Sequence, residues 1–67
     1  MADESIDEFY VKILKATEKA LLCRFGEQEE WIPKSQIVDA GTEVASVGDE
    51  GPLVIPRWLA KAKKLIA

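Results

Sequence analysis

An isoleucine–proline step occurs twice in this chain, at Ile32-Pro33 and at Ile55-Pro56, and each one is a place where the local pattern must change. Proline has no N–H to donate to a strand ladder, so a strand ends there or lies at a sheet edge. The isoleucine follows a tryptophan in the first step and a valine in the second, and a cation follows each proline. The two steps therefore predict a strand-rich body and a different C-terminal element.

Before Pro56 the apolar residues mostly recur with a period of two. Phe9, Val11 and Ile13 fall on one face of a predicted strand, and Tyr10, Lys12 and Leu14 fall on the other. A period of two with β-branched and aromatic residues is typical of a strand. By the same criterion we expect further strands at residues 20–25, 31–32, 42–47 (weakly) and 53–55, with turns at 26–29 and 48–51.

After Pro56 the period becomes helical, and proline suits the first turn of a helix. We expect a helix over residues 56–66 that docks on the sheet through the apolar stripe Trp58, Leu59, Ala62, Leu65 and Ile66. The predicted fold class is α+β, mostly β: an antiparallel sheet of three to five strands over about residues 9–55, with one C-terminal helix. An SH3-like barrel is the closed form of the same prediction. Residues 1–8 are expected to be a flexible acidic segment, and residues 9–67 a single small domain.

The chain has 67 residues, 48% of them hydrophobic, which fits one compact domain. It has one cysteine and no histidine, which argues for a reducing compartment and excludes a tetrahedral zinc site in practice. The acidic N-terminus does not match a signal peptide, and no apolar run is long enough to span a membrane. We expect a cytoplasmic protein without metal or cofactor.

Charge is divided unevenly along the chain. Residues 1–50 hold all 12 acidic residues and five cations, a net −7, whereas the rest hold four cations and no acid. The C-terminal segment is therefore basic and the body acidic. A net charge of −3 is unusual for a DNA-binding domain.

The candidate binding residues are the two tryptophans and the cations near them: Trp31, Lys34, Arg57, Trp58, Lys61 and Lys64. An exposed tryptophan could stack on a base or anchor a partner. Core packing is the favoured interpretation for both rings, because few other large side chains are available to fill the core. For the cations of the helix, the favoured interpretation is likewise that they form its solvent-exposed face.

The sequence contains no catalytic signature. Cys23 shares a predicted apolar face with Leu21 and Phe25, where a thiol is an inert core residue. A phosphate-binding glycine loop, a serine triad and a spaced carboxylate pair are all missing from the sequence. We therefore expect a protein that is not an enzyme.

Three segments carry a resemblance: residues 17–22 (Thr-Glu-Lys-Ala-Leu-Leu), 30–37 (Glu-Trp-Ile-Pro-Lys-Ser-Gln-Ile) and 55–60 (Ile-Pro-Arg-Trp-Leu-Ala). In this order they resemble a group of short proteins encoded in bacteriophages and prophages, over about residues 16–66. The Trp-Ile-Pro-Lys-Ser-Gln segment is the specific part. The resemblance implies a phage-type accessory protein and assigns no activity.

The sequence favours a non-enzymatic binding module that contacts a protein partner. One alternative is an accessory factor of phage replication or recombination that contacts single-stranded DNA weakly; a solvent-facing tryptophan beside Lys34 or Arg57 would favour it. Another is an acidic inhibitor of a host nucleic-acid-binding enzyme. That role predicts one face that gathers five carboxylates: Glu27, Glu29, Glu30, Asp49 and Glu50.

Overall fold

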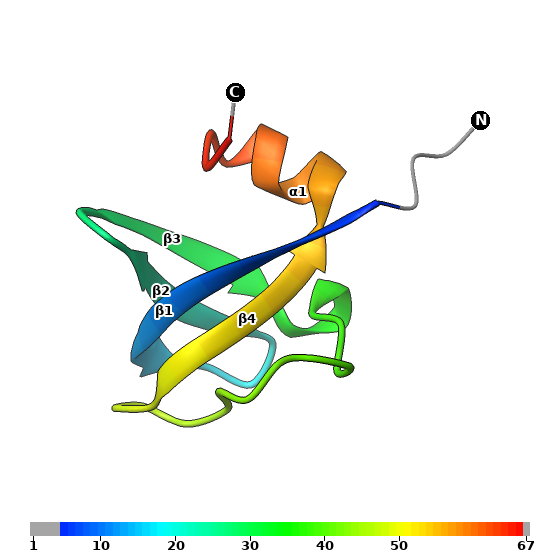
Figure 1. The fold of residues 1–67 in the computed structure, drawn as a ribbon. Coiled ribbons are helices and arrows are strands. Elements are labelled where there is room, and N and C mark those ends of the chain that lie inside the picture. Colours follow the sequence, from blue (N-terminus) through cyan, green and yellow to red (C-terminus); the bar gives the residue numbers. More distant parts are fainter. Residues whose placement is uncertain (1–4, 67) are drawn as a thin grey trace.

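The structure is a computed structural model that describes residues 5–66. Its elements are β1 (Ile6–Ala16), β2 (Ala20–Phe25), β3 (Gln28–Pro33), the 3₁₀ turn η1 (Lys34–Gln36), β4 (Glu50–Pro56) and α1 (Arg57–Ala62). The strands form one antiparallel sheet in the order β3-β2-β1-β4 (Figure 1). The predicted antiparallel sheet with one C-terminal helix is confirmed. β3 and β4 are its two edges and do not pair with each other, so the sheet curls without closing.

The alternation read from the sequence determines which side chains are buried. Val11 and Ile13 of β1 lie in the core, as do Leu21 and Cys23 of β2. Phe9 and Phe25 pack edge to face with ring centroids 5.4 Å apart, at the rim of the same core. Such pairs stabilise by about 1 kcal/mol beyond the area they bury.

β1 begins at Ile6 rather than at the expected Phe9. Ile6, Asp7 and Glu8 pair with Pro56, Ile55 and Val54 of β4. These three residues were expected in the flexible segment, but the pairing with β4 places them in the sheet. Ser5, from the same segment, accepts a hydrogen bond from the Arg57 N–H at 2.8 Å, and residues 1–4 lie outside the described residues.

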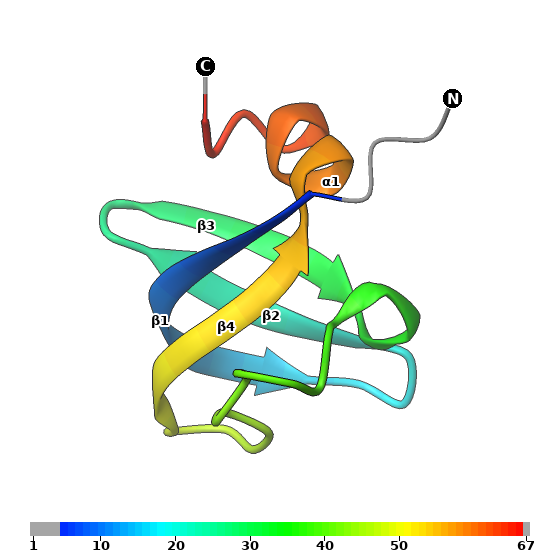
Figure 2. The same ribbon diagram turned by 45° about the vertical axis from the view of Figure 1, so that its right-hand side comes forward.

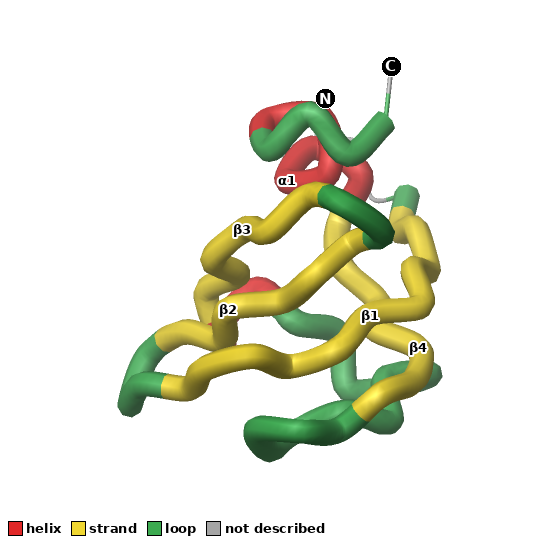
Figure 3. Tube along the Cα trace, turned by 90° about the vertical axis from the view of Figure 1, so that its left-hand side faces the viewer, coloured by secondary structure: helices red, strands yellow, loops and turns green. Residues whose placement is uncertain are grey.

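The predicted strand at residues 42–47 is wrong, because these residues belong to a loop from Ile37 to Asp49. The loop runs beside the outer edge of β4 (Figure 3) and binds it through single contacts rather than a ladder. The Glu43 N–H donates to the Pro52 carbonyl, and the Val54 N–H donates to the Thr42 hydroxyl. The loop thereby covers a strand edge that would otherwise be free.

The end of this loop is held by one carboxylate. The Asp49 side chain accepts hydrogen bonds from the N–H groups of Ser46 and Ala45, at 2.8 and 2.9 Å. These two bonds lower the pKa of the Asp49 carboxyl below its ordinary value. The turn predicted at residues 48–51 lies at residues 46–49 instead, because Glu50 and Gly51 already belong to β4, and it joins a loop to β4 rather than joining two strands.

The helix is shorter than predicted, and its buried side differs. α1 ends at Ala62 because Lys64 adopts a left-handed conformation with φ 61°. Leu59 and Ala60 are buried, whereas Trp58 and Ala62 of the predicted stripe are exposed. Leu65 and Ile66 still pack against the core, from beyond the turn. Figures 1 and 2 show α1 at the end of the curled sheet where β1 begins and β4 ends.

Candidate functional site

The face of the sheet that points away from the core carries the exposed aromatic residues. The alternation that buries Val11 and Ile13 places Tyr10 and Lys12 on the outer face of β1. Tyr10 is 74% exposed, and Trp31, on the outer face of β3, is 41% exposed. The favoured prediction that Trp31 fills the core is therefore wrong: Ile32 occupies the inward position, and the ring at position 31 must face outward.

One row across this face is apolar; we call it the tryptophan row (Leu14, Leu22 and Trp31). Trp31 is the register partner of Leu22, which in turn is opposite Lys15. The register shifts between Ile13 and Lys15, so Leu14 is an extra residue opposite Leu22. Leu14 and Leu22 are each half-buried; Leu22 lies beside the exposed ring, and Leu14 lies one strand further away next to the exposed Lys15. The row is thus a small apolar surface with an aromatic end.

The next row along the strands is charged; we call it the charged row (Glu29, Arg24, Lys12 and Glu50). Register pairs join Glu29 to Arg24, Arg24 to Lys12 and Lys12 to Glu50. Two cations therefore stand directly opposite each other in the middle of the sheet. Among residues 5–66 the only ion pair joins Arg57 to Asp7, so the charged row contains none.

A shallow hollow of about 330 Å³ opens at the inner pair of the charged row. Its lining consists of Tyr10, Lys12, Arg24, Gly26 and Glu50. The Arg24 Nε donates to the Gly26 carbonyl at 2.9 Å, which fixes the guanidinium beside the hairpin turn. Gly26 has a φ of +66°, the left-handed region that a two-residue hairpin turn requires of its first residue.

The six predicted binding residues divide over three places. Trp31 lies on the outer sheet face, whereas Lys34 lines a recess on the other side of the sheet together with Leu21. One form of the condition set for nucleic acid, an exposed tryptophan beside Lys34, is therefore not met at Trp31. The other form, an exposed tryptophan beside Arg57, is met by Trp58, which follows Arg57 in the chain and is 50% exposed.

The other four predicted residues belong to α1 and the turn that follows it. The Arg57 guanidinium binds both carboxylate oxygens of Asp7, at 3.1 and 3.2 Å, and so ties the start of the helix to β1. Trp58 is 50% exposed, and Lys61 and Lys64 are exposed as well. Core packing of Trp58 is thus also wrong, because Leu59 and Ala60 take the inward positions of this short helix.

The carboxylates predicted to gather on one face are scattered. Glu29 and Glu50 stand at opposite ends of the charged row, with two cations between them. Glu30 is on the other side of β3, where it accepts a hydrogen bond from Gln28. Asp49 is occupied with its own loop. This arrangement counts against an inhibitor that acts through one acidic surface.

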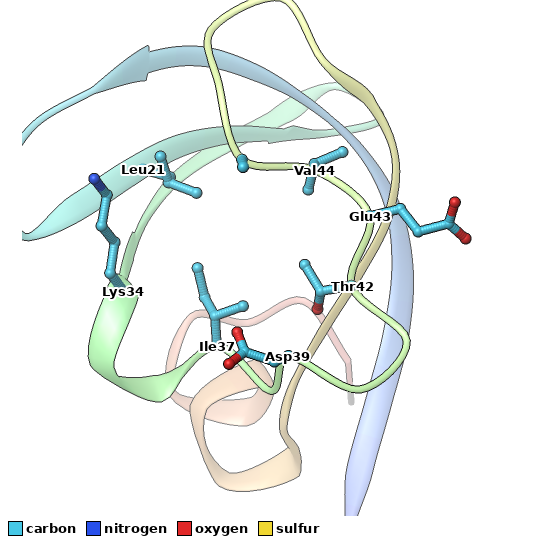
Figure 4. A pocket seen from close by; sticks show the side chains of 8 residues that line it. Leu21, Lys34, Ile37, Asp39, Thr42, Glu43 and Val44 are labelled. Carbon is cyan, nitrogen blue, oxygen red and sulfur yellow. The ribbon is translucent and has the colours of Figure 1, made fainter.

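A recess of about 500 Å³ lies between β2, η1 and the long loop (Figure 4). Leu21, Ile37 and Val44 supply its apolar walls, and Lys34 and Asp39 stand at its rim. The Thr42 hydroxyl is already committed, since it donates to the Val38 carbonyl at 2.6 Å. No aromatic side chain lines the recess, so the outer face of the sheet is the stronger candidate site.

The described residues offer little reactive chemistry. Cys23 is fully buried, and burial raises the pKa of its thiol to about 11, so the nucleophilic thiolate is scarce at neutral pH. No cluster of three metal-ligating side chains occurs within residues 5–66. In the same stretch, no helix is both long and apolar enough to cross a bilayer.

Four further candidate residues were not predicted from the sequence: Tyr10, Lys12, Leu22 and Arg24. The sequence does indicate that these side chains point outward, because the alternation that places their neighbours in the core places them on the opposite face. What was missing was the register, which brings the outward residues of three strands into two rows.

Comparisons with family models, with curated proteins and with solved structures returned no match to this chain.

Proposed function

We propose that this protein is a non-enzymatic binding module that docks a protein partner on the outer face of its sheet. The observation that carries the proposal is Trp31, a large ring left exposed at the end of an apolar row on an edge strand. Exposed tryptophans beside half-buried leucines are the kind of residue that anchors a protein interface. We also propose that the protein is of phage or prophage type and that its curled, open sheet is SH3-like.

The surroundings of Trp31 favour protein over nucleic acid. On the outer face its cross-strand neighbour is Leu22, and Glu29 lies two residues away along β3. A nucleic-acid backbone laid over the ring would meet that carboxylate, whereas single-strand binders surround their stacking ring with cations. The net charge of −3 acts in the same direction.

The test is site-specific photo-crosslinking in the cells that make the chain. A benzophenone side chain replaces Trp31 in one protein and Val47 in a matched control; Val47 is 60% exposed and lies in the long loop. We expect a discrete protein adduct from position 31 alone. In lysate, an excess of the unmodified chain should compete it away, and the Trp31→Ser chain should not. Equal labelling from both positions, or an adduct that nuclease removes, would refute the proposal.

A second candidate is an accessory factor that contacts single-stranded DNA, and the exposed side chains of α1 favour it. Trp58, Lys61 and Lys64 together offer a ring and two free-standing charges. Oligonucleotide titration at low and moderate salt, followed by tryptophan fluorescence, tests this role. It requires saturable quenching that weakens steeply with salt and is lost in Lys61→Glu/Lys64→Glu. Absence of binding at low salt excludes it.

A further inference from the structure

The inner pair of the charged row is unusual because Lys12 and Arg24 are direct register partners. Cβ atoms of directly opposite residues are about 5 Å apart, and like charges in that arrangement destabilise a sheet. Neither residue forms an ion pair within residues 5–66, although each has an acid as register partner on its other side, Glu29 for Arg24 and Glu50 for Lys12. An anion placed between the two cations would relieve their mutual repulsion.

We propose that Lys12 and Arg24 bind a carboxylate of the protein partner, so that the partner presents an acidic side chain next to its apolar anchor. This inference rests on the proposed function and names the chemistry of the partner. A carboxylate between the two cations turns the repulsion into two charge-assisted contacts. Arg24 is held in place for this by its bond to the Gly26 carbonyl, which uses one of its five N–H donors.

The shape of the hollow fits a small anionic group. Its volume of about 330 Å³ accepts the end of one side chain, and Tyr10, which is 74% exposed, forms part of its lining. The tyrosine hydroxyl can donate a hydrogen bond to an acceptor in the hollow. The site thus combines two cations, a neutral donor and an aromatic wall.

The flanks of the row favour a carboxylate over a phosphate. Glu29 lies one strand beyond Arg24, and Glu50 one strand beyond Lys12. Glu50 also lines the hollow, so a bound anion meets one acid beside the two cations, and a group with a single negative charge is repelled least. A phosphate carries nearly two charges when terminal, and a nucleic-acid strand repeats its charge, so each meets repulsion from Glu29 or Glu50.

The spacing of the two rows defines the partner further. Leu22 and Arg24 are two residues apart on β2, which is about 7 Å along a strand. The partner therefore places an apolar side chain and a carboxylate about 7 Å apart, the distance between residues i and i+2 of an extended segment. An extended acidic peptide with alternating apolar residues meets this requirement.

The direct test is a titration of the protein with a blocked pentapeptide, Ser-Leu-Ser-Glu-Ser. The backbone amide NMR signals of Lys12 and Arg24 report the binding. We expect binding on the order of millimolar, weakened about tenfold by Lys12→Gln or by glutamine in place of the peptide glutamate. Lys19→Gln is the matched control, because it removes one exposed cation from the β1–β2 turn. It should leave the affinity unchanged.

Three results would overturn the inference. One is equal binding of the glutamine peptide, and another is an equal loss of affinity from Lys19→Gln, which would reduce the site to general electrostatics. The third is tighter binding of a phosphoserine peptide or of an oligonucleotide, which would assign the site to phosphate. In cells, Lys12→Gln should lower the crosslinking yield at position 31. If the adduct at position 31 persists undiminished, the inference fails while the proposed function stands.

Discussion

Cys23 is the residue whose acidity folding changes most among the described residues. Its thiol is fully buried between β1 and β3, and its pKa rises from the ordinary 9.0 to about 11. Because the pKa is raised in the folded state, the thiol's contribution to the stability of the fold is fully present below pH 9.0 and is lost as the pH rises toward 11. Above pH 9.0 the thiol ionises only in the unfolded chain, and this favours unfolding.

Cys23→Ala separates this effect from every other group that titrates in the same range. We expect wild type to lose about 1 kcal/mol of unfolding free energy relative to Cys23→Ala between pH 7 and pH 10. The two chains differ only at position 23, so the comparison isolates the thiol. Urea unfolding at the two pH values measures the difference. A constant difference between the two chains would contradict the burial of the thiol.

At the same scale, burial was the property that the sequence predicted least well for the tryptophans. Both were expected in the core because large rings are few, yet each follows or precedes an aliphatic residue that fills the inward position better. In β3 that residue is Ile32, and in α1 it is Leu59. The alternation of β3 already points Trp31 away from Ile32, so parity was the better guide than residue size.

At the scale of elements, the strands and their faces followed from local pattern, while the loop and the helix end did not. Residues 42–47 have apolar side chains in a strand-like order, but their backbone partners are single groups of β4 and the carboxylate of Asp49. Such contacts are not local in sequence. The length of α1 likewise depends on a backbone conformation that the residue type at position 64 does not announce.

Lys64 ends α1 in a left-handed conformation that glycine adopts without strain. The Leu65 N–H donates to the Ala60 carbonyl and the Lys64 N–H to that of Lys61, the pair of bonds that defines a Schellman motif. Lys64→Gly should therefore stabilise the fold by about 0.5–1 kcal/mol, which raises Tm by a few degrees.

Two controls make this prediction specific. Lys64→Ala removes the same charge but keeps the strain, so its Tm should not rise. Lys61→Gly places glycine inside the helix, where it costs about 1 kcal/mol relative to alanine. Thermal unfolding followed by circular dichroism ranks the three variants. A Lys64→Gly chain no more stable than Lys61→Gly would show that α1 does not end in this motif.

At the scale of the whole molecule, the sheet and the helix share one hydrophobic core. α1 spans six residues, too few to be stable in water alone, and its Leu59 and Ala60 join the same cluster as Ile32 and Ile55. The Gln28 side chain donates to the Lys63 carbonyl at 2.8 Å, which links β3 to the end of the helix. The acidic body and the basic C-terminal segment are joined by the ion pair of Arg57 and Asp7.

This arrangement predicts that the two tryptophans report one unfolding event. Trp58→Phe leaves the ring on β3 as the only fluorophore of its kind, and Trp31→Phe leaves the ring on α1. Because both elements share one core, the midpoint from fluorescence should coincide with that from circular dichroism within each variant. For a chain of this size the slope in urea should be about 1 kcal/mol per molar. If the signal from Trp58 changes at lower urea than the sheet does, α1 docks as a separate unit, and the single core inferred from Leu59 and Ala60 is wrong.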